Sequence, residues 1–213
     1  MKLYYATGAC SLADRISLHE AGLAVQFERV DLKSKTTESG ADFMVINPKG
    51  YVPLLVLDNG DTITENIAIL SWIASQASEL APPGPLGQIR QLEALAFIST
   101  EVHHGFKPFL QHLSDADRAK ATNDATKRYN LIASSFSGPY LLGSRFTVPD
   151  AYLFVTLRWA RQLNVPIPDL LRQYFERMMG RASVRRALDE EGLDADLLML
   201  ADSRLRQRAM TDA

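Results

Sequence analysis

The sequence predicts an α/β domain followed by an all-helical domain. Residues 1–80 alternate short apolar runs with helical patterns, an order typical of a small sheet, parallel at first, with helices on its faces. Residues 88–193 carry helical patterns alone. Between them the stretch ELAPPGPLG, which starts at Glu79, holds three prolines and two glycines in nine residues. We therefore expect domains at 1–80 and 88–193, a linker at 81–87, and a C-terminal extension at 194–213 that is an added helix or a frayed tail.

The composition is that of an ordinary globular protein. The 213 residues are 46% hydrophobic and 23% charged, and the formal net charge of -2 leaves no basic footprint for nucleic acid or an anionic membrane. No apolar run approaches the ~20 residues that a membrane span needs. The N-terminus enters a strand pattern at once and lacks the longer apolar core of a signal peptide, so we expect a cytoplasmic protein.

The first domain opens with a strand, a tight turn and a helix. The turn Thr7-Gly8-Ala9 leads into a helix that begins at about Cys10 or Ser11, and Gly22 ends it, as a glycine just past a helix commonly does. A polar loop then separates a second strand from a short helical segment. These elements are expected at Lys2–Ala6, Cys10–Ala21, Gln26–Val30, Lys33–Gly40 and Ala41–Ile46.

The stretch NPKGYVPLLVLDNGDTITEN, from Asn47 to Asn66, predicts a loop, a hairpin and a helix start. Pro53 has no N–H for a sheet ladder, so it marks a sheet edge or the end of the apolar strand Leu54–Leu57. A cis bond at Val52-Pro53 would turn the backbone of Val52 outward, where it could pair with an extended peptide. Asp58 to Asp61, with Asn-Gly at its centre, is typical of a hairpin turn before a return strand at Thr62–Ile63.

The helix that begins at Glu65 and Asn66 offers a seat for a negatively charged group. Its free backbone N–H groups and positive dipole end suit a carboxylate. Together with Val52 and Cys10, these residues describe a site for a short peptide with a free amino-carboxylate end, in which an acid meets the ammonium and an amide meets the carboxylate. Lys35, on the polar loop, could meet a second carboxylate.

The second domain is expected to be a set of helices. Pro108 is expected to kink the first of them. Thr147 and Asp150 have the form of a capping box, and the helix they open is apolar on more than one side, so we place it at the centre of the domain. The helices are expected at Gln88–Leu113, Asp115–Ser137, from Thr147 onward, Pro168–Met179 and Ser183–Glu191.

Cys10, the single cysteine, excludes an intrachain disulfide and is either an inert core residue or a reactive thiol. It lies at the first turn of a helix, where the helix dipole lowers a thiol pKa. Redox proteins with a thioredoxin-like domain carry C-x-x-C at this place, whereas this chain reads CSLA, so dithiol exchange is excluded and a mixed disulfide with an external thiol stays open. We favour the functional thiol.

The whole set of motifs resembles the bacterial beta-class cytosolic glutathione transferases. The resemblance rests on YYATGACSLA, KSKTTESGADF, NPKGYVPLL and TENIAIL in the first domain, and on STEVHHGFKPFL, YLLGSRFTVPDAYLF and LRWA in the second. It covers nearly all of Met1 to Leu193. It implies a thioredoxin-like glutathione-binding domain, an all-helical domain that completes an electrophile pocket, and a homodimer, with glutathione as co-substrate and no other cofactor.

The resemblance also implies roles for individual residues. Cys10 and His103 would lie beside the sulfur of glutathione as catalytic residues, and Val52 with Pro53 would hold the cysteinyl backbone. Glu65 and Asn66 would hold the γ-glutamyl end, and Lys35 would meet the glycyl carboxylate. The electrophile pocket is expected to be lined by the aromatic residues Tyr5, Phe106, Phe109, Tyr152 and Trp159, which would suit apolar or aromatic substrates.

Two positions depart from the family pattern. The family usually has serine where this chain has Asn66, and an amide can still donate to a carboxylate, so we expect retained binding with altered affinity. Ala96 stands where related enzymes often have an asparagine that reaches the partner subunit's glutathione. Glu101 and His104 give one Glu-x-x-His spacing with no second ligand set, so no metal site is predicted.

The sequence thus predicts an enzyme that conjugates reduced glutathione to small electrophiles, with thiol-disulfide exchange at Cys10 as a second chemistry. The alternatives are a non-enzymatic glutathione- or protein-binding module on the same fold, and a glutathione-dependent dehalogenase or isomerase.

Overall fold

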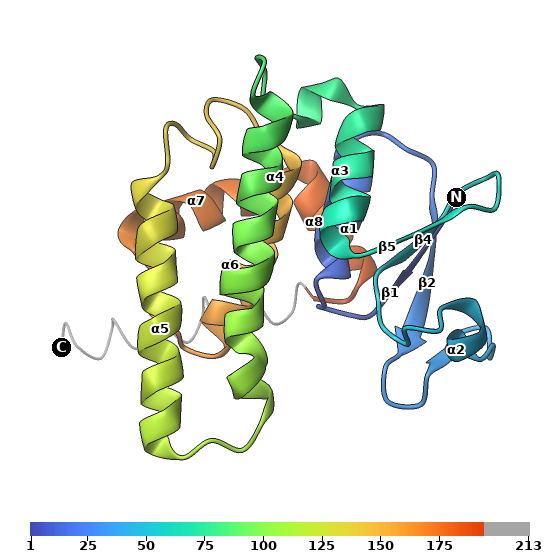
Figure 1. The fold of residues 1–213 in the computed structure, drawn as a ribbon, viewed down its shortest axis with the longest axis horizontal. Helices are drawn as coiled ribbons and strands as arrows, with labels where there is room; N and C mark the ends of the chain where they lie inside the picture. Colours follow the sequence, from blue (N-terminus) through green and yellow to red (C-terminus); the bar gives the residue numbers. More distant parts are fainter. Residues whose placement is uncertain (194–213) are drawn as a thin grey trace.

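The computed structural model describes residues 1–193, so the predicted C-terminal extension lies outside the described residues. Figure 1 shows a sheet at one side of the molecule and a group of helices at the other, with α1 (Ser11–Glu20) and α3 (Asn66–Gln76) between them. The thioredoxin-like α/β part and the helical part therefore meet through two helices that belong to the first part.

The sheet has five strands in the order β3-β2-β1-β4-β5. At its centre Leu3 lies opposite Phe27 in a parallel pair and opposite Leu55 in an antiparallel pair. The polar loop contains a two-residue strand that the sequence did not suggest, because two threonines between lysines and glutamate give no apolar signal. The strands are β1 (Lys2–Tyr5), β2 (Gln26–Asp31), β3 (Thr36–Thr37), β4 (Leu54–Val56) and β5 (Thr62–Thr64).

The two faces of the sheet are covered differently. On one face α1 and α3 bury Leu12, Ile16 and Ile73 in a core that continues into the helical part. On the other face the short helix α2 (Phe43–Ile46) places Phe43 in a small separate cluster with Tyr4 and other side chains of the sheet. The side chain of Asp42 accepts a hydrogen bond from Met44 N and so caps α2.

The helical part begins with one helical run from Gly87 to Leu110 that changes its geometry twice. It is α-helical in α4 (Gly87–Phe97), π-helical in η2 (Ile98–His103) and 3-10 in η3 (His104–Leu110), after the short turn η1 (Ser78–Leu80). The expected kink at Pro108 is replaced by these changes, which begin ten residues before it. Such π-helical insertions are frequent at functional sites.

The remaining helices of residues 1–193 are α5 (Asp115–Ser134), α6 (Val148–Gln162), α7 (Asp169–Met179) and α8 (Ala182–Glu190). As predicted, α6 is central and buried around most of its circumference. The predicted capping box is present: Thr147 N and Thr147 Oγ1 donate to Asp150 Oδ2 at 2.8 and 2.9 Å. Asp150 Oδ1 accepts from Leu141 N and from the Tyr174 hydroxyl, so this buried carboxyl group joins three segments of the helical part.

The loop of residues 7–9, the Gly8 loop, is held by α6 and by the residue that follows α8. The indole Nε1 of Trp159 on α6 donates to the Gly8 carbonyl at 2.8 Å. The Gly8 N–H donates to Glu191 Oε2, just after α8, also at 2.8 Å. Arg15 on α1 lies between two aromatic rings of the sheet and approaches Glu191 Oε1 at 3.2 Å. None of the helices in the described part of the chain is long and apolar enough to cross a bilayer.

Candidate active site

Cys10 occupies the N-cap position of α1, immediately after the Gly8 loop. It is partly buried and packs against the main core. The sequence led us to expect a lowered thiol pKa, but burial, followed by the charge of Asp14, raises the pKa of Cys10 to about 12. The helix N–H groups act in the expected direction and are outweighed. The resting thiol is therefore protonated at neutral pH.

Val52 and Pro53 lie at the end of the loop that leads into β4, and the bond between them is cis. Of the two positions that the sequence left open for Pro53, the structure has the strand end, since β4 lies between β1 and β5 in the sheet. The backbone of Val52 is outside the paired part of β4, which begins at Leu54.

Glu65 is the residue before α3 and has a backbone φ of 71°. A non-glycine residue in this region is uncommon, and such residues gather at functional sites. Its carboxylate accepts hydrogen bonds from Lys49 Nζ at 2.6 Å and from the Tyr51 hydroxyl at 2.7 Å. These two bonds, that of Lys49 first, lower the pKa of Glu65, so the acid stays ionised at neutral pH. Lys49 lies between Pro48 and Gly50, and Tyr51 follows them; neither residue was predicted to belong to the site from the sequence.

Asn66 points into the protein and not toward a ligand on the surface. Its side chain is buried, and Nδ2 donates to the Cys10 carbonyl at 3.1 Å and to Asp14 Oδ2 at 2.8 Å. The opposite amide orientation would bring the oxygen against two acceptors. The expectation that this amide donates to a substrate carboxylate is therefore wrong for this arrangement, because both of its N–H groups are used inside.

Lys35 is next to the same surface. It has a backbone φ of 59°, and its Nζ donates to the Gly50 carbonyl at 2.7 Å. The cation thus lies beside the loop that carries Lys49 and Tyr51. The fold brings Lys35, Val52 and Glu65 from three separate segments to the region around β4.

His103 lies at the end of the π-helical segment and contacts α6. Its Nδ1 is 2.6 Å from the Tyr152 hydroxyl, and its ring meets the Trp159 ring edge-on at 4.8 Å between centroids. Burial, with the nearby charges of His104 and Lys107, lowers the pKa of His103 to about 4. Burial raises the pKa of Tyr152. A neutral imidazole can accept at Nδ1 from the Tyr152 hydroxyl, and in that tautomer Nε2 carries the ring proton.

Aromatic side chains continue from His103 along η3. The Phe106 ring lies 5.7 Å from the Phe109 ring and 5.7 Å from the Trp159 ring. Tyr5 does not join this cluster: its ring stacks on the Arg15 guanidinium at 4.1 Å. The structure therefore brings four of the five predicted pocket residues together and places Tyr5 with α1.

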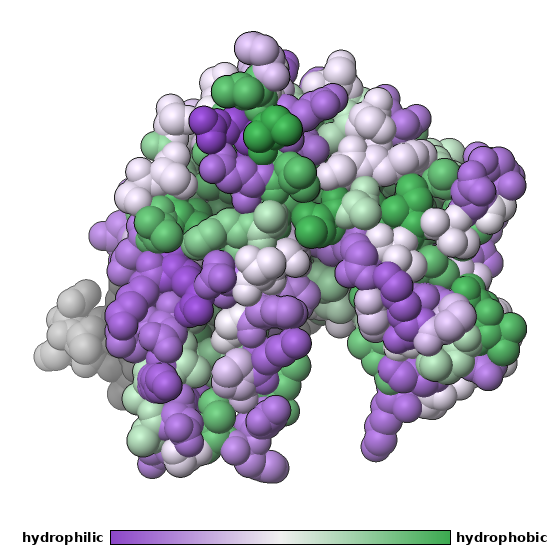
Figure 2. Space-filling view, viewed as in Figure 1, coloured by the Kyte–Doolittle hydropathy of each residue, from purple (hydrophilic) through white to green (hydrophobic). Residues whose placement is uncertain are grey.

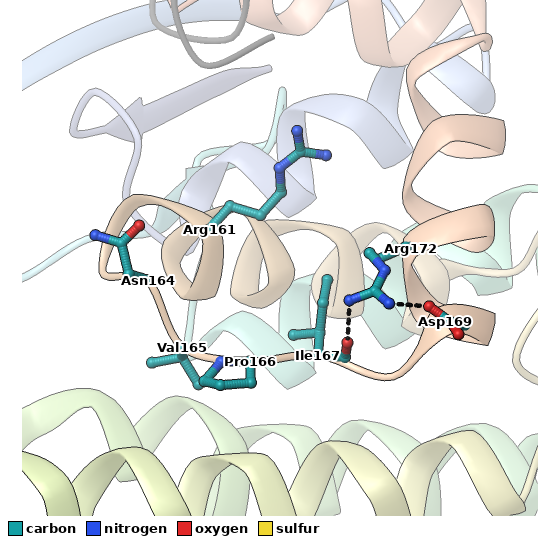
Figure 3. A pocket seen from close by; sticks show the side chains of 7 residues that line it. All are labelled: Arg161, Asn164, Val165, Pro166, Ile167, Asp169 and Arg172. Carbon is teal, nitrogen blue, oxygen red and sulfur yellow. Dashed lines mark hydrogen bonds and ion pairs between the residues drawn. The ribbon is translucent and has the colours of Figure 1, made fainter. Parts of the chain in front are cut away.

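The structure also has a cavity that none of these residues line. Figure 3 shows this cavity, of about 450 Å³, at the turn between α6 and α7, where Arg172 bonds to the Ile167 carbonyl and to Asp169. No residue that lines it belongs to the predicted site. Within residues 1–193 there is no group of three or more His, Cys, Asp or Glu side chains that could hold a metal ion.

Comparison with known families matches both parts of the chain. The profile described as "Glutathione S-transferase, N-terminal domain" matches residues 9–76, and that described as "Glutathione S-transferase, C-terminal domain" matches residues 97–182. The chain is similar to glutathione S-transferase GstA of Escherichia coli O157:H7, with 36% identity over 91% of this chain and 100% of the relative. It is also similar to glutathione S-transferase GST-4.5 of Xanthomonas campestris, with 38% identity over 91% of this chain and 100% of the relative.

Solved structures give the same picture. A ternary complex of BphK, a bacterial glutathione S-transferase, superposes with a TM-score of 0.85 at 40% identity and covers 91% of this chain and 100% of its own. A sphingomonad glutathione S-transferase in complex with glutathione superposes with a TM-score of 0.84 at 39% identity and the same coverage. A beta-class enzyme of Sphingomonas chungbukensis follows at 0.82 and 40%, again over 91% of this chain and 100% of its own.

Proposed function

The chain belongs to the glutathione S-transferase family, a family of enzymes that use glutathione as co-substrate without another cofactor, and we propose that it joins glutathione to small apolar or aromatic electrophiles. The observation that supports this substrate class is the cluster of Phe106, Phe109, Tyr152 and Trp159 next to His103. A rigid aromatic wall favours flat, apolar partners.

Glutathione would lie across β4 and the start of α3. In this placement the Val52 backbone pairs with the cysteinyl residue and Glu65 binds the γ-glutamyl ammonium. The backbone N–H groups at the start of α3 bind the γ-glutamyl carboxylate without help from the Asn66 side chain. Lys35 would meet the glycyl carboxylate after leaving the Gly50 carbonyl.

Catalysis would come from alignment and from donors around the sulfur of glutathione. The thiolate attacks the electrophilic carbon, a new carbon–sulfur bond forms, and the leaving group departs with the electron pair of the bond that breaks. In the tautomer in which Nδ1 accepts from the Tyr152 hydroxyl, His103 carries its proton on Nε2 and is suited to donate a hydrogen bond to that thiolate. It does not act as a cation, since burial holds its pKa at about 4.

The test of this function is a conjugation assay with 1-chloro-2,4-dinitrobenzene, followed by absorbance of the product. We expect glutathione-dependent turnover that falls at least tenfold in His103→Ala and is unchanged in His112→Ala, a histidine change outside the proposed site, because removal of one oxyanion-type donor has effects of this order or larger. Equal turnover in the two variants would remove His103 from the reaction.

Thiol-disulfide exchange at Cys10 is a second candidate chemistry, favoured by the position of the thiol at the start of α1. The Cys10 thiolate would attack oxidised glutathione, form a mixed disulfide and release one glutathione thiolate. Because the pKa of Cys10 is raised, we expect the adduct to form slowly at neutral pH and faster as the pH rises. Intact-mass spectrometry after incubation with oxidised glutathione tests this, with Cys10→Ala as the control. No adduct at any pH would exclude the exchange.

We also propose that the protein is a cytoplasmic homodimer. Leu86, just before α4, and Ile89 and Leu92, in the first half of this helix, are all more than half exposed. Figure 2 shows apolar side chains gathered over this end of the helix. Their spacing of three residues places them on neighbouring positions of one surface, which suits burial against a second copy. Light scattering at micromolar concentration should give twice the chain mass, and Ile89→Lys should shift the mass toward the monomer. A monomeric wild type would refute the dimer.

We also propose that the first domain ends at residue 80 and that the helical domain begins at residue 88.

A further inference from the structure

Asp14 is a buried carboxyl group that the reaction described so far does not use. It follows Cys10 by four residues on α1, so the two side chains lie on the same face of the first turn. Its side chain is 0% exposed, and Oδ1 has no hydrogen-bond partner among the described residues. Buried carboxyl oxygens are rarely left so, and those that are call for an explanation.

Asn66 ties this carboxyl group to the backbone of Cys10. One side-chain amide donates both to Asp14 Oδ2 at 2.8 Å and to the Cys10 carbonyl at 3.1 Å. The start of α3 and the first turn of α1 are thereby joined by a bridge whose centre is Asn66. A change in the charge of Asp14 therefore affects both the start of α3 and the first turn of α1.

Other titratable and charged groups face the first turn of α1 from each element packed around it. The charge of Glu65 raises the pKa of Cys10 as the charge of Asp14 does, but its effect is smaller. Burial raises the pKa of Asp14 well above that of an exposed aspartate. The groups are Tyr5 on β1, Glu65 before α3, Tyr152 and Arg158 on α6, and Glu191 after α8.

We propose that Asp14 is a positioning residue for the thiol chemistry at Cys10: through Asn66 it fixes the first turn of α1, and the charge of its carboxyl group sets the pH at which the thiol reacts. While Asp14 is neutral it does not oppose ionisation of the thiol. Once Asp14 ionises, its negative charge holds the proton on Cys10. A glutathione sulfur bound beside Cys10 lies in the same field, so the pH profile of conjugation follows the same rule.

The experiment measures Cys10 alone and needs no glutathione. Because the chain has one cysteine, the release of thiopyridone from 4,4′-dipyridyl disulfide reports only the attack of Cys10 on that disulfide. The second-order rate is followed against pH for the full-length protein and for Asp14→Asn, which keeps the shape of the side chain and removes its charge. This inference rests on the proposed role of Cys10, but conjugation is assayed separately, so the failure of one does not decide the other.

In Asp14→Asn the midpoint of the profile should fall by about one pH unit or more, the usual effect of removing a neighbouring like charge. Below the midpoint a shift of one unit raises the thiolate fraction about tenfold, and since a less basic thiolate is a weaker nucleophile, the rate should rise about threefold. In an Asn66→Ala background the same substitution should give a smaller shift, because Asp14 is no longer held.

Asp189→Asn, an exposed acid on α8, is the matched control and should leave the midpoint where it is. A merely structural Asp14 would lower the unfolding temperature in Asp14→Asn and leave the midpoint at the wild-type value. That result, or an equal shift in Asp189→Asn, would overturn the proposal. If Asp14→Asn does not fold, Asn66→Ala alone must still move the midpoint for the proposal to stand.

Discussion

The substitution Glu65→Gln separates the affinity of the protein for glutathione from the stability of its fold. In the free protein Glu65 accepts bonds from Lys49 and Tyr51, yet its side chain is 52% exposed. An ion pair this open contributes about 0–1 kcal/mol to stability, so the variant should unfold close to the wild-type temperature. Replacing the Glu65 carboxylate with a neutral amide should weaken its hydrogen bond to the ligand ammonium by about 1.5–3 kcal/mol. The dissociation constant for glutathione should therefore rise roughly 10- to 150-fold.

Isothermal titration calorimetry at fixed low salt measures this difference, and Lys49→Met is the informative companion. If Lys49 competes with the ligand ammonium for the carboxylate, its removal leaves the affinity unchanged or raises it. The pKa of Glu65 is lowered by Lys49 and then by Tyr51, so its charge, and the affinity that depends on it, should persist on acidification until the pH falls through that lowered value. Unchanged affinity in Glu65→Gln, or an equal loss in Lys49→Met, would show that Glu65 does not hold the ammonium.

Three further predictions concern the helical part. Burial raises the pKa of Asp150 to about 6, so the stability it supports is fully present below its unfolded pKa and is lost as pH rises through about 6, by about 3 kcal/mol; urea unfolding of wild type and Asp150→Asn between pH 4 and 7 should show this dependence only in the wild type. Tyr152→Phe removes the bond to His103 Nδ1 and should lower kcat/KM about fivefold, the equivalent of about 1 kcal/mol, with little change in calorimetric affinity for glutathione. Trp159→Phe removes the donor to the Gly8 carbonyl and should destabilise the protein by about 1 kcal/mol in the same unfolding assay, whereas no change would mean that this bond is not formed in solution.

The sequence predicted the elements well where a signal is local. Thr147 and Asp150 are a capping box by composition and spacing, and the box is present. Pro53 was predicted to mark a sheet edge or a strand end, and the structure has the strand end, with a cis bond before it. One helix was predicted at Gln88–Leu113, and the structure has a helical run from Gly87 to Leu110. Its change to π-helical and 3-10 geometry was not predicted, since apolar spacing does not distinguish these helices over a few residues.

The site was predicted less completely because burial is not a local property. The pKa of Cys10 was expected to be low from its place at a helix start, and burial, which depends on the packing of α6 against α1, reverses that expectation. Asn66 was expected to face the ligand, but its amide turns inward toward Asp14. Asp14 was not predicted to take part in the site, because a single acid within a helix has no distinctive pattern of its own. The signal that could have found Asp14 is its spacing of four from the only cysteine, on a helix with little exposed surface.

The contacts of the Gly8 loop couple the unfolding of the two parts of the molecule. The Gly8 carbonyl is bonded to α6 and the Gly8 N–H to Glu191, just after α8. Arg15 on α1 is buried against the same Glu191. Opening the boundary between the two parts would leave these polar groups without partners, so separation and melting should coincide in one cooperative calorimetric transition. A ligand that touches only the sheet side would then protect the far helices from hydrogen exchange as strongly as it protects its own strands.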